Sequence, residues 1–217
     1  MKNRICTESA CVSEDCIKRL SLYLRSLKEL EKKKVSIISS DKITKLLRVT
    51  PVQFRKDLSY FGEFGKRGVG YSVSGLIKEL ERILGIDRRW NIVLVGVGHL
   101  GRALLGFEGF SKFNMKIEYA FDCNKEKIGK VINGVEIKDV NNLETIVRKA
   151  GIKVGIITTV PQAANDVAKK MVDAGIIGIL NFTPVMLNVS DDIFISNIDM
   201  ACELKSLIFF IKQRLNI

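Results

Sequence analysis

Residues 91–104 read NIVLVGVGHLGRAL, an apolar run that leads into the pattern G-x-G-x-x-G and then into a helical segment. In a strand–turn–helix unit of this kind, Gly96 permits the tight turn and Gly98 lets the backbone approach a pyrophosphate, while Gly101 lets the helix pack closely on the strand. The helix begins where the phosphates would lie. This stretch predicts a dinucleotide-binding α/β domain built on a parallel sheet.

A second apolar segment, residues 117–122, ends in an acid. Asp122 lies 21 positions after Gly101. An acid about 20 residues beyond the glycines binds the hydroxyl groups of the adenosine ribose and disfavours a 2′-phosphate. We therefore expect NAD(H) rather than NADP(H) as the cofactor.

Further alternation of strands and helices follows. Residues 154–159 and 176–182 are predicted strands, and residues 161–174 a predicted helix. Ligands bind beyond the carboxyl ends of strands in open parallel sheets, so these ends are expected walls for the nicotinamide half. The cofactor contacts expected from the glycine loop and the strand ends are Gly96, Val97, Gly98, His99, Leu100, Gly101, Asp122, Thr159, Val160, Pro161, Asn181, Phe182 and Thr183.

The sequence offers little for catalysis. His99 is the sole histidine and lies inside the expected phosphate loop, and no His–Asp or Lys–Tyr constellation or catalytic cysteine context is visible. Only 35 residues follow Phe182, too few for a separate substrate domain. We expect a protein that is not an enzyme, binds no metal and uses the dinucleotide as a signal. The alternatives are a small NAD-dependent oxidoreductase with a basic accessory domain, and a regulator whose ligand is not a dinucleotide.

The charge is distributed unevenly along the chain. Its 217 residues carry a net charge of +11. Residues 1–85 hold 18 Lys/Arg against 10 Asp/Glu, a net of +8, and the remainder holds 17 against 14, a net of +3. Such a local excess indicates a polyanionic partner for the amino-terminal part. The composition is that of a globular protein, with no apolar run long enough to span a membrane and no signal peptide, so a cytoplasmic location is expected.

The first 85 residues have the pattern of short amphipathic helices. One helix is predicted over residues 15–32, and a second from Ser39 or Ser40 to Leu47. A third begins at Thr50-Pro51, with Gln53 completing a capping box. Its apolar face, which includes Phe54 and Leu58, is expected to turn inward. Gln53, Arg55, Lys56 and Ser59 are expected to project outward.

Residues 62–71 contain a glycine-rich basic loop, with Lys66 and Arg67 at its tip. A helix-turn-helix followed by such a β-loop is a winged helix, and a further helix over residues 75–84 then ends at Gly85. The third helix is expected to enter the major groove of operator DNA, while the loop reaches the backbone or the minor groove. The expected DNA contacts are Ser39, Ser40, Thr50, Gln53, Arg55, Lys56, Ser59, Tyr60, Lys66, Arg67, Gly68 and Tyr71.

The carboxyl-terminal segment from residue 197 is predicted to be a helix with an apolar stripe. Leu204, Leu207, Ile208, Ile211 and Leu215 share one face. Packing on the chain's own sheet and a dimer interface are both open, and we favour the dimer because two recognition helices then meet two half-sites of a palindrome.

The spacing of the cysteines suggests neither a disulfide framework nor a metal site. Cys6, Cys11 and Cys16 are too widely spaced for a CxxC metal knuckle, and Cys123 and Cys202 stand alone. Free thiols are therefore expected, as is usual inside a cell.

Residues 54–71, FRKDLSYFGEFGKRGVGY, resemble the redox-sensing transcriptional repressor family Rex. Similar too are residues 88–90, the glycine loop, and the stretches 121–122, 181–184 and 198–200. The resemblance implies a homodimer that binds operator DNA when NAD⁺ predominates and releases it when NADH rises. It also implies a carboxyl-terminal helix swapped between protomers and a nicotinamide near the dimer interface, which adds Phe107 and Met200 to the cofactor contacts.

The family couples the oxidation state of the ring to the domain angle through an Arg on the first helix, an Asp before the last helix and often a Tyr after the glycine loop. Arg25 and Asp199 match the first two, whereas Phe107 stands at the Tyr position and has no hydroxyl. The expected architecture is a winged-helix DNA-binding domain over residues 1–85 (with 1–14 undefined), a Rossmann-like domain over 86–196 and a swapped dimerisation helix over 197–217.

Overall fold

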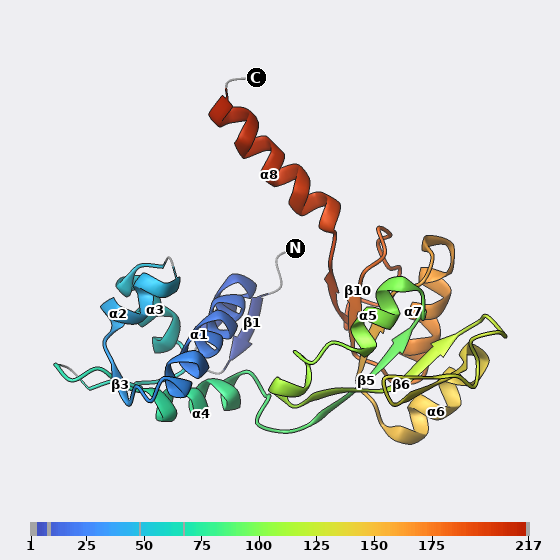
Figure 1. Cartoon of the computed structure of the whole chain (residues 1–217), viewed down its shortest axis with the longest axis horizontal. Helices are drawn as coiled ribbons and strands as arrows, with labels where there is room; N and C mark the ends of the chain where they lie inside the picture. The colour runs from blue at the N-terminus through green and yellow to red at the C-terminus, as the bar shows by residue number, and fades with distance from the viewer. Residues whose placement is uncertain (1–3, 8–9, 48, 67, 216–217) are drawn as a thin grey trace. The chain divides into compact units, whose positions relative to one another are not determined.

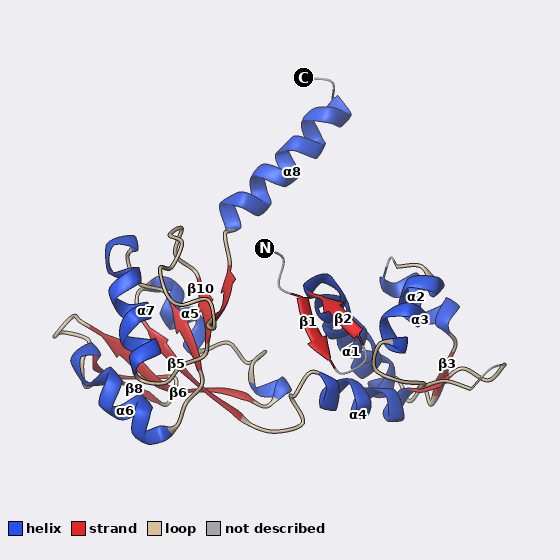
Figure 2. Ribbon diagram, turned by 180° about the vertical axis from the view of Figure 1, so that it is seen from behind, coloured by secondary structure: helices blue, strands red, loops and turns tan. Residues whose placement is uncertain are grey.

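The computed structural model describes residues 4–7, 10–47, 49–66 and 68–215, with the backbone alone before residue 12. The chain divides into two compact units, residues 1–88 and 89–217. Figure 1 traces the chain in colour, and Figure 2 shows the same elements by secondary structure. Each unit contains buried hydrophobic residues of its own.

The first unit is helical with two short antiparallel ladders. Its helices are α1 (Glu14–Lys32), α2 (Ser40–Leu47), α3 (Pro51–Ser59) and α4 (Val73–Ile83). The ladders pair β1 (Arg4–Thr7) with β2 (Ala10–Ser13), and β3 (Ile37–Ile38) with β4 (Tyr71–Ser72). All four expected helices are confirmed. The β1–β2 hairpin was not expected, because the polar sequence before residue 14 carries no strand pattern.

Side-chain caps explain where three of these helices begin. The hydroxyl groups of Ser13, Thr50 and Ser72 accept hydrogen bonds from backbone N–H groups in the first turns of α1, α3 and α4. Gly85, at a φ of +68°, follows the end of α4, where a left-handed residue commonly stops a helix. The Thr50 cap and the Gly85 stop were predicted from the sequence, whereas the Ser13 and Ser72 caps were not.

The glycine-rich loop forms a wing beside the helices. Lys66 and Gly70 form a β-bridge, and the loop then runs into β4, which pairs with β3. Gly70 has a φ of +108°, and a Cβ there would lie 2.6 Å from the carbonyl oxygen of Ile38. Only glycine fits this close approach of two backbone segments.

The second unit is built on a seven-stranded sheet in the order β11-β10-β9-β5-β6-β8-β7. The strands are β5 (Trp90–Val95), β6 (Met115–Asp122), β7 (Val131–Ile132), β8 (Val135–Asp139), β9 (Val154–Ile157), β10 (Gly178–Asn181) and β11 (Phe194–Asn197). Every pairing is parallel except that of β7 with β8. The predicted parallel α/β domain is confirmed, while β7, β8 and β11 were not expected.

Helices cover both faces of this sheet. Alternate residues of β5 serve opposite faces: Val93 and Val95 join the core made with α6 (Leu143–Ala150) and α7 (Ala164–Asp173). Ile92 and Leu94 join a second core, to which α5 (His99–Leu105) contributes. Burial on both faces explains why β5 reads as a nearly continuous apolar run.

The last helix, α8 (Met200–Leu215), begins three residues later than the segment expected from the sequence, because Asn197 ends β11. Every residue of α8 is exposed, so this helix does not pack on the sheet of its own chain. Among the described residues, no helix is long and apolar enough to cross a membrane.

Candidate nucleotide pocket and DNA-binding surface

The glycine loop has the geometry that its sequence predicts. Gly96 has a φ of +99°, and a Cβ there would lie 2.7 Å from backbone atoms of Thr158 and Thr159. A Cβ on Gly101 would overlap the carbonyl oxygen of Gly96, whereas nothing lies within 4 Å of the corresponding position at Gly98. Gly96 and Gly101 thus allow tight packing, and Gly98 leaves open space above the loop.

A cavity of about 430 Å³ lies at this loop, beyond the carboxyl ends of β5, β6 and β9. The chain leaves β5 toward β6 on one side and later returns to place β9 on the other, which makes this the topological switch point of the sheet. The cavity brings together five residues expected from the sequence: Gly96, Gly98, Asp122, Thr159 and Val160.

Eight other lining residues were not predicted, because they lie in loops and short helical segments or on α7, outside any motif. They are Cys123, Asn124, Lys127, Val140, Ala163, Asp166, Val167 and Lys170. Val95, from the strand before the glycine loop, and Thr158, from a strand end that was expected to form a wall, also line the cavity. The nearest signal was the position of α7 after a strand end, which predicts that its first turns face the ligand.

One buried polar atom of the cavity wall has no hydrogen-bond partner. The hydroxyl oxygen Oγ1 of Thr159 is buried and unpaired, whereas Oγ1 of neighbouring Thr158 donates to the carbonyl oxygen of Gly96 at 2.7 Å. Buried hydroxyl groups are normally satisfied. Thr159 lines the same cavity as Gly98, so its orphaned hydroxyl fits a polar ligand such as a dinucleotide.

The carboxylate of Asp122 is engaged within the protein. Oδ2 accepts a hydrogen bond from the N–H of Val97 at 2.8 Å and one from Nζ of Lys127 at 2.9 Å, and Oδ1 accepts one from the N–H of Asn124 at 2.9 Å. Burial acts to raise the pKa of Asp122, but these three donors lower it overall, so the group is held as the anion.

The other predicted cofactor residues lie outside this cavity. Phe182 packs against one core of the sheet, and Asn181 and Thr183 are buried and hydrogen-bonded to each other, with Oδ1 of Asn181 accepting from both N and Oγ1 of Thr183. Phe107 and Met200 are exposed, Phe107 in edge contact with Phe110. His99, Leu100, Gly101 and Pro161 also do not line the cavity, and Val97 reaches it only through Asp122.

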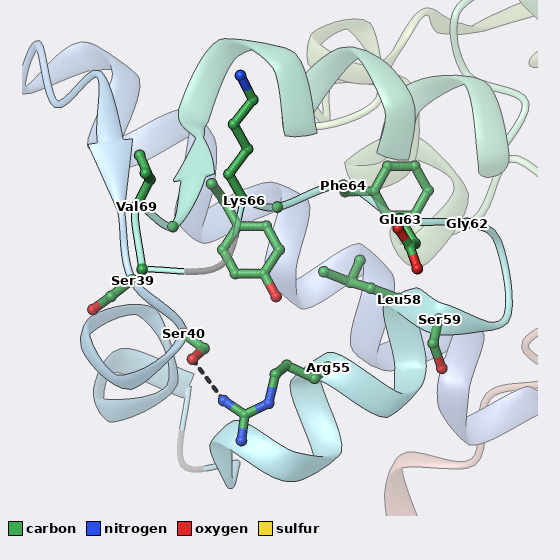
Figure 3. A pocket seen from close by; sticks show the side chains of 14 residues that line it. Ser39, Ser40, Arg55, Leu58, Ser59, Gly62, Glu63, Phe64, Lys66 and Val69 are labelled. Carbon is green, nitrogen blue, oxygen red and sulfur yellow. Dashed lines mark hydrogen bonds between the residues drawn. The ribbon is translucent and has the colours of Figure 1, made fainter.

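A groove of about 630 Å³ separates α3 from the wing (Figure 3). Seven residues that were expected to contact DNA line it: Ser39, Ser40, Arg55, Ser59, Lys66, Gly68 and Tyr71. Arg55 extends from α3 toward the start of α2, where its Nη1 donates to Oγ of Ser40 at 2.8 Å. The predicted recognition helix and wing thus share one surface.

The remaining expected DNA contacts are distributed around α3. Lys56 is exposed on the helix, and Tyr60 is half-buried just after its end. Thr50 is the N-cap, with its hydroxyl accepting from the N–H of Gln53 at 3.1 Å. Arg67 lies outside the described residues.

Gln53 differs from the expectation that it projects outward. Its Nε2 donates to Oδ1 of Asp57 at 2.7 Å, so it is turned along α3 toward a fully buried carboxylate. Asp57 also accepts from Tyr23 and Arg19 of α1. The capping-box pattern could not predict this, because the competing partner is one turn ahead in the core.

The two residues expected to form the redox switch lie in different units. Arg25 is exposed on α1. Oδ1 of Asp199 accepts from the N–H groups of Ala201 and Cys202 at 2.9 and 3.0 Å, so Asp199 caps the start of α8.

In the described part of the chain, neither the cysteine side chains nor the residue types that bind metals form a further site. Cys16, Cys123 and Cys202 are free thiols as expected, while the side chains of Cys6 and Cys11 lie outside the described part of the chain. Within that described part, no group of three or more His, Cys, Asp or Glu is placed to hold a metal ion.

Comparison with known proteins supports both units. Residues 11–59 match the family model described as "Putative DNA-binding protein N-terminus", and residues 87–185 match the model of the CoA binding domain. The crystal structure of RSP in complex with β-NAD⁺ and operator DNA superposes with a TM-score of 0.90, at 35% identity over 94% of each chain. The structure of RSP with β-NADH superposes with a TM-score of 0.85, at 34% identity over 94% of this chain and 96% of that one.

Curated relatives match the sequence of this chain over nearly its whole length. The redox-sensing transcriptional repressor Rex of Syntrophobacter fumaroxidans is 45% identical over 88% of this chain and 91% of its own. The Rex protein of Carboxydothermus hydrogenoformans is 43% identical over 93% of this chain and 97% of its own. The chain therefore belongs to the Rex family of redox-sensing transcriptional repressors.

Proposed function

We propose that this chain is a homodimeric repressor that binds operator DNA through α3 and the wing and releases it when NADH occupies the cavity at the glycine loop. The observation that carries the proposal is the presence in one chain of two separate sites, a basic winged-helix groove and a switch-point cavity with an unpaired buried hydroxyl. Neither site alone would make a ligand-controlled DNA-binding protein.

The residues that would hold the dinucleotide follow from the cavity. Gly98 leaves room for the pyrophosphate, Oγ1 of Thr159 offers an unused donor and acceptor, and Val160 supplies apolar surface. When bound, the dinucleotide supplies a nicotinamide ring that is cationic in NAD⁺ and neutral in NADH. The cavity has no histidine or tyrosine among its described lining residues, which supports a sensing role over hydride transfer to a substrate.

On the DNA side, Arg55 and Lys56 would donate to base edges from α3, and Lys66 and Arg67 would meet the backbone or the minor groove. The hydroxyl groups of Ser39 and Ser59 lie on the same groove and suit phosphate oxygens. The charge excess of +8 in residues 1–85 adds a salt-dependent attraction for duplex DNA.

A dimer would form through the exposed apolar stripe of α8, with the helix swapped between protomers. Leu204, Leu207 and Ile208 are each more than half exposed, an arrangement that a lone chain in water does not favour. Arg25 and Asp199 would then carry the coupling between units, and Phe107 would contribute ring packing, because it cannot donate a hydrogen bond.

Coupling requires that NADH bind the DNA-incompetent form more tightly than NAD⁺ does. A preference of about 10–100-fold corresponds to about 1.4–2.7 kcal/mol. Reciprocity then requires operator DNA to weaken NADH binding by the same factor as NADH weakens operator binding.

The test is a titration of NADH with and without a palindromic operator, paired with mobility shifts in NAD⁺ and NADH. We expect weaker NADH binding in the presence of operator and loss of the shifted band in NADH. Equal NADH affinities in the two titrations would overturn the proposal.

A further inference from the structure

Two cysteines lie directly opposite each other in the hairpin that precedes α1. Strands β1 and β2 pair antiparallel, in a register that sets Cys6 against Cys11. The next pair, Thr7 with Ala10, closes the hairpin, and two residues of the sequence separate them. The pair beside a two-residue turn is of the hydrogen-bonded type, and the two types alternate along an antiparallel ladder. Cys6 and Cys11 therefore occupy a non-hydrogen-bonded position.

This position matches the geometry that a disulfide needs. Directly opposite residues of this type have their Cα atoms about 4.5 Å apart. Disulfides join residues whose Cα atoms are about 4.4–6.8 Å apart. A bond between Cys6 and Cys11 would therefore fit the register that the backbone already has. A slip of one residue in this register would place the two cysteines on opposite faces of the hairpin.

Val12 shows which face of the hairpin packs onto the first unit. It follows Cys11 on β2 and is only 2% exposed, and β2 contacts α1. Because successive residues of a strand alternate between faces, Cys11 and its partner Cys6 lie on the face opposite to that of Val12. A small reagent would approach the two cysteines from that face.

The third cysteine of this region is unsuited to the same chemistry. Cys16 lies in the first turn of α1 and is buried. Burial and the negative charge of Asp57 raise the pKa of its thiol to about 12. Thiol–disulfide exchange requires a thiolate and access to it. Register and burial therefore favour one of the three pairings that Cys6, Cys11 and Cys16 would allow.

We propose that Cys6 and Cys11 form a modification site, at which exchange with a small disulfide such as oxidised glutathione closes a reversible bond across β1 and β2. The thiolate of one cysteine attacks the small disulfide, which forms a mixed disulfide and releases one small thiolate. The thiolate of the other cysteine then attacks the mixed disulfide and releases the second. The two cysteines lose two protons and two electrons, and the small disulfide becomes two thiols.

This site is separate from the nucleotide cavity and responds to the ratio of thiol to disulfide around the protein. It revises the expectation of free thiols for this one pair. The bond would tie β1 to the strand that leads into α1, because β2 ends at Ser13, whose hydroxyl caps that helix.

The experiment equilibrates the full-length protein in glutathione buffers of increasing oxidised fraction, then denatures it and alkylates the remaining thiols with iodoacetamide. Trypsin cuts after Arg4 and Lys18, so residues 5–18 leave as one peptide that contains Cys6, Cys11 and Cys16. A disulfide appears as the loss of two hydrogen atoms from this peptide, and the fragment spectrum shows which cysteine was alkylated instead.

Two variants test the register. Cys16→Ser removes the buried thiol. The double variant Cys6→Ser/Thr7→Cys is the matched control, because it keeps two thiols in the hairpin but moves the first one to the other face of β1. Thermal unfolding of the reduced proteins shows whether each variant keeps its fold.

We expect the parent and Cys16→Ser to form the bond between Cys6 and Cys11, with Cys16 of the parent alkylated, and dithiothreitol to restore the thiols. The double variant should close with an equilibrium constant at least about tenfold lower. In urea, where the register is lost, it should close as readily as the parent. The inference is overturned if the folded parent stays reduced throughout the series, if its disulfide includes Cys16, or if the folded double variant closes as readily as the parent.

Discussion

Arg19 of α1 holds the fully buried carboxylate of Asp57 on α3 through two hydrogen bonds, from Nε to Oδ2 at 2.6 Å and from Nη2 to Oδ1 at 2.7 Å. The hydroxyl of Tyr23 and Nε2 of Gln53 complete the shell, each at 2.7 Å. A buried carboxylate with four donors to its two oxygens fixes the register of α3 against α1. The helix proposed to read DNA is therefore anchored from its buried side.

Removing the carboxylate should destabilise the first unit. Asp57→Ala leaves the Arg19 guanidinium without its partner, and losing one partner of a buried ion pair costs about 3–5 kcal/mol of the free energy of unfolding. Urea unfolding followed by circular dichroism measures this loss. Asp87→Ala, at an exposed aspartate outside the helices, is the control and should change the value by less than about 0.5 kcal/mol. A loss of similar size in both variants would contradict the anchoring role.

The same carboxylate should make stability fall at acid pH. Burial acts to raise the pKa of Asp57, but the hydrogen bonds from Arg19, Tyr23 and Gln53 lower it overall. Because the folded pKa lies below the unfolded value of about 3.9, the stabilisation is complete above that value and is lost as the pH falls through the folded pKa. The free energy of unfolding should therefore fall more steeply below about pH 4 in the parent than in Asp57→Asn. Parallel curves for the two proteins would exclude this linkage.

Arg55 should depend on Ser40 for its contribution to operator binding. Arg55→Ala is expected to cost about 1–3 kcal/mol of binding free energy if the guanidinium reads a base. Ser40→Ala removes only the acceptor that holds the guanidinium in the groove, so its loss should be smaller. Because the second change acts through the first, the double variant should resemble Arg55→Ala. Fluorescence anisotropy with labelled operator measures all three, and fully additive losses would show that the two residues act independently.

Much of the fold was predictable from local signals, and the cofactor pocket was predictable only in part. Gly96, Gly98 and Gly101 have fixed spacing because one tight turn joins one strand to one helix, so the sequence carries their geometry directly. β11 was missed because two of its four residues are polar and its place at the edge of the sheet depends on pairing with β10. Strand order depends on contacts between distant segments, which no local pattern contains.

The individual side chains that differ from the sequence-based prediction do so for a similar reason. The sequence places Gln53 at the third helical position but does not reveal that Asp57, one turn later, is buried and draws its amide inward. It places Asp122 at a strand end but does not reveal that a lysine five residues later folds back onto it. In both cases the side chain has more than one possible hydrogen-bond partner, and tertiary packing determines which partner lies within hydrogen-bond distance.

The free thiols should differ in reactivity. Burial and the neighbouring negative charge of Asp57 raise the pKa of Cys16 to about 12, whereas Cys123 is exposed and lines the nucleotide cavity. Because the thiolate is the reactive form, iodoacetamide at pH 8 should modify Cys123 in the native protein and leave Cys16 unmodified. Mass spectrometry of tryptic peptides measures both sites.

Bound NADH should slow the alkylation of Cys123, because the ligand would cover the cavity wall. Cys16, which is buried in the first unit and does not line the cavity, is the internal control and should stay unmodified with and without NADH. Equal rates at Cys123 in the two conditions would place the dinucleotide elsewhere.

The exposed stripe of α8 should hold the dimer together. Ile208 lies on the face shared with Leu204, Leu207 and Ile211, and its side chain is 62% exposed in the single chain. Burying a side chain of this size contributes about 1.5–3 kcal/mol, and placing a carboxylate there adds the cost of desolvating a charge. Ile208→Glu should therefore shift the protein from dimer to monomer in multi-angle light scattering.

The matched control for that change is Gln213→Glu. Gln213 lies on the side of α8 opposite the apolar stripe, is also exposed, and receives the same charge with almost no change in shape. It should leave the dimer intact. The monomeric variant should also bind a palindromic operator more weakly than the control, because two linked recognition helices reach their half-sites at a high effective concentration. If Ile208→Glu and Gln213→Glu give the same mass and the same operator affinity, the dimer is held by another surface, and the apolar stripe of α8 serves a different partner.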